Sequence, residues 1–226
     1  MQRGLSPGRH FLDLLADHHP DARGILLQGL TRCPSRSRAE FIEPLQRFGP
    51  DIWCKLLELP GTEEFDRVLA PQLHKPEVQD FLLDRGPQAA ASLSKVLRMT
   101  ASESLLNSKA PADEQRLAWA RELVSYPESA TCALYYLLRC FQEEGRQRLL
   151  DLLGHENPRM RYQALAAARF TLPDWPKLLL SRPSDPDPEI RRYILVWLTS
   201  KGDLTSQESE EVQKLLGSEQ PNLPDS

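Results

Sequence analysis

The 226-residue sequence has no apolar segment of membrane-spanning length and none of the short motifs that mark common enzyme classes. It contains no uninterrupted run of about 18 apolar residues, so it predicts no transmembrane helix. We find no G-x-S-x-G, H-E-x-x-H, P-loop or dinucleotide-binding fingerprint on which a catalytic mechanism could be built. The N-terminus also lacks the apolar core of a signal peptide. We therefore expect a cytoplasmic protein, and we favour a non-catalytic role while leaving enzymatic activity open.

Cysteine is scarce, and metal-binding patterns are lacking. The four cysteines have no C-x-x-C spacing, which predicts reduced thiols and no zinc site. The only histidine cluster is His18-His19, flanked by Asp17 and Asp21. Adjacent histidines in a turn rarely converge on one ion, so we interpret this segment as the turn before a helix. We expect no metal and no cofactor.

An excess of charge of one sign occurs only at the C-terminal end. The formal net charge is −4, and the segment from Asp203 onward contains six acidic residues against one base, Lys214. The preceding 202 residues therefore contain 27 bases and 26 acids, a net charge of +1. A body this close to neutral lacks the electrostatic signature of a strong nucleic-acid binder. We expect a protein partner rather than nucleic acid.

The sequence does contain an internal repeat of about thirty residues. Residues 187–191 read Asp-Pro-Glu-Ile-Arg, and residues 157–161 read Asn-Pro-Arg-Met-Arg. In both segments the first residue suits an N-cap and the proline suits the first helical position. An apolar pair follows six and seven residues after each proline, and four earlier prolines show the same spacing more weakly. The six prolines are Pro20, Pro50, Pro76, Pro127, Pro158 and Pro188.

A second set of amphipathic segments precedes these proline-led helices. One begins near Pro111 and continues to Val124, and others contain leucine runs at 149–153 and 178–180. No alternating strand pattern occurs, so the sequence predicts an all-α chain. The step of 51 residues between Pro76 and Pro127 predicts one irregular unit at about 86–112.

The C-terminal segment is predicted to form a separate part. A capping box at 205–208 and a glycine at Gly217 predict an acidic helix over 203–217 that caps the array. The polar residues 218–226 predict a disordered tail.

The segments 152–161 and 179–191 resemble HEAT repeats of the short kind, in which the second helix opens with Asp/Asn-Pro-x-Val-Arg. The resemblance is clearest over 146–202, and Pro44 and Pro71 also resemble the proline that bends the first helix of many HEAT units. The resemblance implies a right-handed α-solenoid of stacked antiparallel helix pairs over residues 1–202. It carries almost no information about activity.

The candidate partner-binding residues lie one turn into the two clearest repeat helices. An arginine and tyrosine strip there would suit a protein partner, because arginine forms planar bidentate hydrogen bonds. An alternative interpretation is that Arg161 and Arg191 bond acidic caps of neighbouring units, as the HEAT resemblance implies. For Trp119 and Trp197 we predict core positions, and for Trp175 partial exposure. The candidate residues are Arg161, Tyr162, Gln163, Arg191, Arg192 and Tyr193.

We interpret the chain as a non-catalytic protein–protein interaction module or scaffold. One alternative is a nucleic-acid binder, since some HEAT-like proteins are DNA glycosylases. Such a protein would need roughly six to eight lysine or arginine side chains along one face. A further alternative is a chromophore lyase, because phycobilin lyases resemble short HEAT arrays. The partner and the oligomeric state stay open.

Overall fold

The computed structural model confirms an all-α chain across the residues it describes. These residues are 7–33, 39–46, 48, 57, 66–67, 69–181, 185–200, 210, 212 and 214. They contain 11 α-helices and two 3-10 helices, and no strand. No helix in these ranges is both long enough and apolar enough to cross a lipid bilayer. The chain divides into two compact units, Met1–Ala133 and Leu134–Ser226, which are described separately below.

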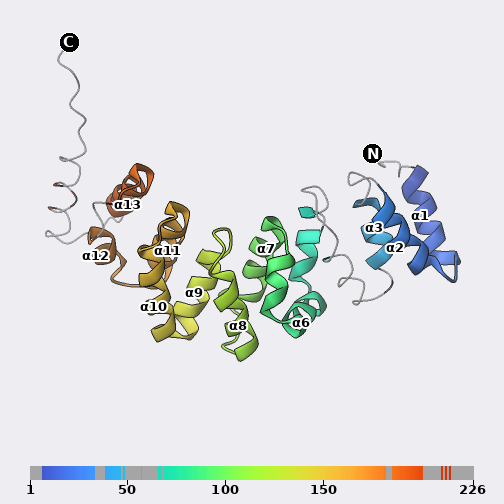
Figure 1. Cartoon of the computed structure of the whole chain (residues 1–226), viewed down its shortest axis with the longest axis horizontal. Coiled ribbons are helices and arrows are strands. Elements are labelled where there is room, and N and C mark those ends of the chain that lie inside the picture. Colours follow the sequence, from blue (N-terminus) through green and yellow to red (C-terminus); the bar gives the residue numbers. More distant parts are fainter. Residues whose placement is uncertain are drawn as a thin grey trace, which may run out of the picture. The chain divides into compact units, whose positions relative to one another are not determined.

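The first three helices of the N-terminal unit pack against one another. They are α1 (Pro7–His18), α2 (Ala22–Arg32) and α3 (Ala39–Gln46), shown in blue in Figure 1. Leu26 and Leu30 of α2 and Leu45 of α3 are completely buried. Pro44 lies inside α3, as the sequence predicted. The helix α2 begins two residues after Pro20 rather than at it.

The rest of this unit surrounds a buried tryptophan. It contains η2 (Ala70–His74), α6 (Pro76–Arg85), η3 (Pro87–Ser92), α7 (Lys95–Leu105) and α8 (Glu114–Leu123). The helix α7 packs against η2 and α8, while η3 packs against α6 and α8. Trp119 of α8 is fully buried, and its Nε1–H donates a hydrogen bond to the carbonyl oxygen of Leu82 at 3.2 Å. The predicted core position of Trp119 is therefore confirmed. In the interval 86–112, the structure places η3 and α7.

The boundary between the two units falls within α9 (Ala130–Cys140). This helix begins three residues after Pro127, not at it. The chain continues from α8 in short turns, in which the amide of Tyr126 bonds the carbonyl of Leu123 and the amide of Ala130 bonds the carbonyl of Tyr126. Because Pro127 lies within those turns, α9 starts later than the proline spacing predicts.

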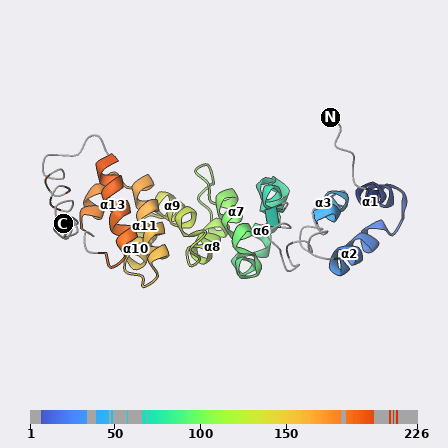
Figure 2. The ribbon, with the colours of Figure 1, turned by 90° about the horizontal axis from the view of Figure 1, so that it is seen from above.

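The C-terminal unit contains the two clearest sequence repeats. Its further helices are α10 (Gln142–Leu153), α11 (Pro158–Thr171), α12 (Trp175–Leu180) and α13 (Pro188–Ser200). The helix α10 packs against α11, and α12 packs against both α11 and α13; Figures 1 and 2 show α11 beside α13. The middle of α11 is buried throughout residues 164–168, so only its two ends are accessible.

Some predictions concern residues outside the described part. Of the predicted helix 203–217, only Glu210, Val212 and Lys214 are described, and each is helical. The predicted tail 218–226 lies outside the described residues. Among the cysteines, Cys33, Cys132 and Cys140 are partly buried, and Cys54 is not described.

Candidate functional site

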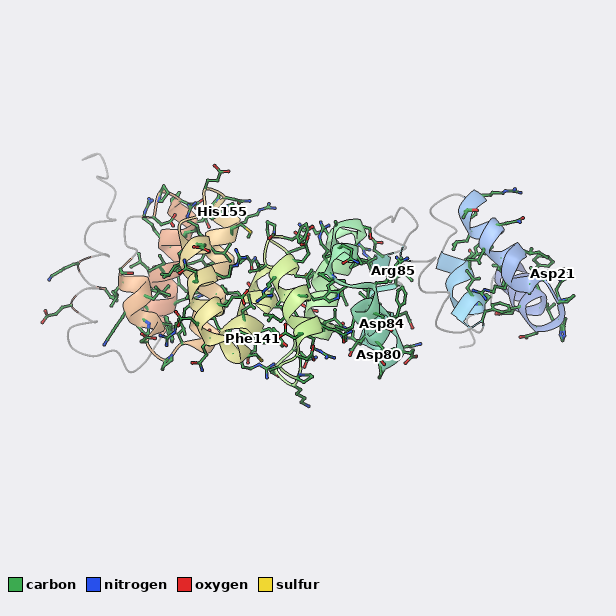
Figure 3. The ribbon with its side chains drawn as sticks, turned by 60° about the horizontal axis from the view of Figure 1, so that its bottom comes forward. Asp21, Asp80, Asp84, Arg85, Phe141 and His155 are labelled. Carbon is green, nitrogen blue, oxygen red and sulfur yellow. The ribbon has the colours of Figure 1, made fainter. Side chains whose placement is uncertain are left out.

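The turns that precede α11 and α13 have the same hydrogen-bond pattern thirty residues apart. Before α11, the Nδ1 atom of His155 accepts from the backbone N–H of Asn157 at 2.9 Å. Before α13, Oδ1 of Asp185 accepts from the N–H of Asp187, also at 2.9 Å. Asn157 and Asp187 then cap their helices by accepting the N–H two residues ahead, at 3.0 and 2.9 Å. The sequence repeat is therefore also a repeat of local structure; Figure 3 labels His155 at the start of α11.

The histidine cluster near the N-terminus has a related role. The Nδ1 atom of His19 accepts from the N–H of Asp21 at 3.1 Å, and Asp21 is the residue before α2. This geometry confirms the predicted turn before a helix. In the described ranges, no group of three or more histidine, cysteine, aspartate or glutamate side chains could hold a metal ion.

Arg161 joins the start of α11 to the turn before α13. Its Nε and Nη2 atoms donate to the two carboxylate oxygens of Asp185 at 2.9 Å each. Its Nη1 atom donates to the carbonyl oxygens of His155 and Glu156. Both side chains of the ion pair are almost buried, at 9% and 7% exposure. The hydrogen bonds to Asp185 raise the pKa of Arg161 above its ordinary value, so the group stays cationic. We call this pair the Arg161–Asp185 clasp.

Arg191 repeats part of this arrangement, whereas Arg192 does not. The Nη1 atom of Arg191 donates to the carbonyl oxygens of Asp185 and Pro186, which precede it by six and five residues. The two carbonyl partners of Arg161 have the same spacing. Arg192 instead extends into solvent, with Nη1 3.8 Å from Oε1 of Glu189. Of the three arginines proposed for partner binding, Arg192 is the exposed one.

The structure also shows an arginine that the sequence reasoning missed. Ser94 caps α7 by accepting from the N–H of Leu97, and Arg98 follows Ser94 by four positions, as Arg161 follows Asn157. The Nε atom of Arg98 donates to Oε1 of Glu128 at 2.6 Å, and its Nη1 atom donates to a carbonyl oxygen five residues earlier. The repeat pattern defined from the sequence starts at a proline, and α7 begins without one, so the pattern does not include Arg98. A search for a cap, two residues, an apolar residue and an arginine would have found it.

Tyr126 lies against the ion pair of Arg98 with Glu128. The guanidinium of Arg98 lies 4.4 Å from the ring centroid of Tyr126. The hydroxyl of Tyr126 donates to Oε1 of Glu122 at 2.9 Å. That hydrogen bond, followed by burial, raises the pKa of Tyr126 above its ordinary value because the protonated phenol is the donor.

The two candidate tyrosines meet in an aromatic cluster on α11 and α13. The ring centroids of Tyr162 and Tyr193 are 4.8 Å apart. The ring centroid of Trp197 lies 5.6 Å from that of Tyr162 and 6.0 Å from that of Tyr193. Arg169 lies seven residues after Tyr162 on α11, and its guanidinium is 5.2 Å from the Trp197 centroid. We call these four residues the α11/α13 strip. The structure thus brings together two residues that lie 31 positions apart in the sequence.

The α11/α13 strip is only partly covered. Tyr162, Tyr193 and Arg169 are half-buried, whereas Trp197 is buried at 8% exposure, which confirms its predicted core position. Phe170, next to Arg169, is 70% exposed. Gln163, the remaining candidate, is also half-buried beside Tyr162.

Arg169 is the strip residue that the sequence reasoning missed. Its guanidinium also lies 5.9 Å from the ring centroid of Trp175 and 6.0 Å from that of Phe170. Trp175 is half-buried, as predicted. No ion pair or hydrogen bond of the Arg169 side chain occurs within the described residues. Its spacing from Tyr162, two helical turns on the same face, is the signal that could have identified it.

Comparison with protein-family models, with curated proteins and with solved structures found no match to this chain. The fold and the site therefore define the class as an all-α protein with a repeated helix-start turn. Any closer assignment rests on the residues themselves.

Proposed function

We propose that this chain is a HEAT-like α-solenoid that acts as a non-catalytic protein–protein interaction module. The repeated turn before α11 and α13 supports the architecture, because it recurs at the thirty-residue interval of the sequence repeat. The clasp arginines Arg98 and Arg161 support it further, since each occupies the fourth position after its cap and bonds an acidic residue ahead in the chain. In such arrays each unit buries its apolar face against its neighbours and leaves an extended surface for a partner.

The observation that carries the functional part is the half-exposed α11/α13 strip. Tyrosine, tryptophan and arginine are enriched at the energetic centres of protein interfaces, because they combine large contact area with a polar end. The hydroxyls of Tyr162 and Tyr193 make no hydrogen bond within the described ranges, so each can bond a partner. Phe170 and Val196, 70% and 52% exposed, extend the apolar area on the same two helices. We therefore place the partner surface on α11 and α13.

The arrangement of the arginines favours a protein partner over nucleic acid. The helices α11 and α13 contain five arginines, but Arg161 and Arg191 bond groups of this chain. Three remain for a ligand on these helices, Arg159, Arg169 and Arg192. That is fewer than the roughly six to eight cations along one face that the nucleic-acid alternative predicts.

Partner capture with two matched tyrosine variants tests the proposal. The immobilised full chain is exposed to native lysate with and without nuclease, beside the variants Tyr193→Ala and Tyr135→Ala. Tyr135 is also half-buried but lies on α9, outside the strip. We expect a stoichiometric protein that survives nuclease and is lost with Tyr193→Ala alone. Capture that is unaffected by Tyr193→Ala would refute the assigned surface, and capture that disappears with nuclease would favour the nucleic-acid alternative.

A further inference from the structure

We propose that the α11/α13 strip binds an acidic peptide segment of its partner, one that carries an aromatic or large aliphatic side chain among its carboxylates. This inference rests on the proposed function and specifies the chemistry of the partner. It follows from three features of the described residues: the charge of the two helices, the surroundings of Arg169, and the exposed apolar residues next to it.

The charge of the two helices is complementary to an acidic ligand. The helix α11 contains three arginines and no acidic residue, and α13 contains two arginines and one glutamate. The two helices together have a formal charge of +4, and the charge is still +2 when Asp185 and Asp187 of the turn before α13 are counted. By contrast, α10, which packs against α11, contains three acids and two arginines, a charge of −1. A cleft or face with a local excess of one sign attracts and orients ligands of the opposite sign.

Arg169 is suited to anchor a carboxylate. Three aromatic rings, those of Trp197, Trp175 and Phe170, lie within 6.0 Å of its guanidinium and restrict its position. Aromatic faces hold the cation but satisfy none of its five N–H donors. Arg161 shows the contrast in the same helix, because its donors are occupied by Asp185 and two carbonyl oxygens. A ligand carboxylate would supply Arg169 with the planar partner that Arg161 already has.

Arg192 provides a second, exposed cation on the same two helices. It lies on α13, five residues before Trp197, which is the neighbour of Arg169. Val196 and Phe170 are the exposed apolar side chains of the same helices. They would contact an apolar side chain placed between the acids.

Titration of the full chain with matched peptides tests the inference. The first probe is a fluorescein-labelled capped nonapeptide of alternating glutamate and serine with one central phenylalanine. The second has glutamine in place of every glutamate, so that it differs in charge alone. Fluorescence polarisation would measure each Kd at low and at physiological salt. We expect the acidic peptide to bind at least about tenfold tighter than the amide peptide, with an advantage that shrinks as salt rises.

Two arginine variants locate the binding. Arg169→Gln removes the proposed anchor, and Arg148→Gln removes an exposed arginine of α10 that lies outside the strip. We expect Arg169→Gln to weaken acidic-peptide binding about tenfold or more and Arg148→Gln to change it less than twofold. Equal binding of the acidic and amide peptides would overturn the inference, as would acidic-peptide binding that Arg169→Gln leaves unchanged.

Other outcomes separate this inference from the proposed function. If neither peptide binds while partner capture still depends on Tyr193, the proposed function stands and the acidic-ligand inference fails. If the acidic peptide binds through Arg169 but Tyr193→Ala leaves capture unaffected, the inference stands and the assigned capture surface fails. A third peptide, residues 203–217 of this chain, carries four acids and one base. If this peptide displaces the labelled acidic probe at a concentration equal to or lower than the unlabelled acidic nonapeptide requires, the assignment to an external partner is overturned. The chain's own acidic segment would then be the ligand.

Discussion

Replacing Arg161 with alanine is expected to destabilise the pairing of α11 with the turn before α13 by about 3–5 kcal/mol, the usual cost of breaking a buried ion pair by removing one partner. The magnitude follows from burial. Asp185 is 7% exposed, so without Arg161 its carboxylate keeps a charge that solvent barely reaches. The two carbonyl oxygens that Nη1 bonds add little, because His155 and Glu156 are exposed and water can replace the donor.

Two further variants separate the charge from the geometry. Asp185→Asn keeps an oxygen that can accept the N–H of Asp187, and Arg161 keeps its two carbonyl partners. We therefore expect a smaller loss than for Arg161→Ala, which leaves the buried carboxylate unpaired. Arg192→Ala is the matched control, because its 3.8 Å pair with Glu189 is 70% and 65% exposed. Exposed pairs contribute only about 0–1 kcal/mol, and we expect the low end of that range.

Hydrogen exchange measured by mass spectrometry is the suitable assay, because the chain has two compact units and one global unfolding transition cannot be assumed. We expect Arg161→Ala to lower the opening free energy of peptides covering 158–171 and 188–200, and to leave peptides from α1 and α2 unchanged. A loss below about 1 kcal/mol, or a loss equal to that of Arg192→Ala, would refute the reasoning that burial makes the clasp strong.

Three other predictions concern packing and pH. Gly145→Ala should lower the opening free energy of α9 and α10 amides in hydrogen exchange by about 1–3 kcal/mol, because its Cβ would lie 2.5 Å from the backbone nitrogen of Leu138 in α9. Gly24→Ala, whose Cβ meets nothing within 4 Å, should raise the opening free energy of α2 amides by about 0.5–1 kcal/mol. Trp119→Phe should lower the opening free energy of α6 and α8 amides in hydrogen exchange by about 0.5–1.5 kcal/mol, because the indole hydrogen bond to Leu82 is lost while the Leu82 carbonyl still accepts the N–H of Gly86. Tyr126 has a raised pKa, so the stability from its hydrogen bond to Glu122 is present below about pH 10 and is lost as pH rises through the folded-state pKa. Tyr126→Phe should therefore show a shallower alkaline loss of stability in a pH series; an identical slope would contradict this.

The all-α class and the two C-terminal repeat helices could be predicted from sequence because their signals are local. Caps, a proline at the first helical position and apolar spacing act within one or two turns, and α11 and α13 begin at Pro158 and Pro188 as predicted. The rule that a proline marks the first helical position placed the start of α9 too early, because Pro127 lies in turns that follow α8. It also missed the clasp of Arg98, because a serine cap carries the signal there without proline.

The candidate site was partly predictable. Tyr162 and Tyr193 share a position in the repeat, so their proximity follows once the two helices are placed side by side. The different roles of Arg161 and Arg192 depend on whether Asp185 lies within bonding distance, which is a tertiary fact. Arg169 was missed for the same reason: its position among aromatic rings is produced by packing between α11, α12 and α13, and no local motif encodes it.

Hydroxyl-radical footprinting of the full chain with and without its captured partner tests the central claim most directly. The oxidation rates of Phe170 and Tyr193 report the proposed surface, and Phe11 of α1, which is 63% exposed, is the internal control. We predict that the partner lowers oxidation of Phe170 and Tyr193 several-fold and leaves Phe11 unchanged. Unchanged rates at Phe170 and Tyr193, with protection at Phe11 instead, would contradict the account and place the partner on the N-terminal helices.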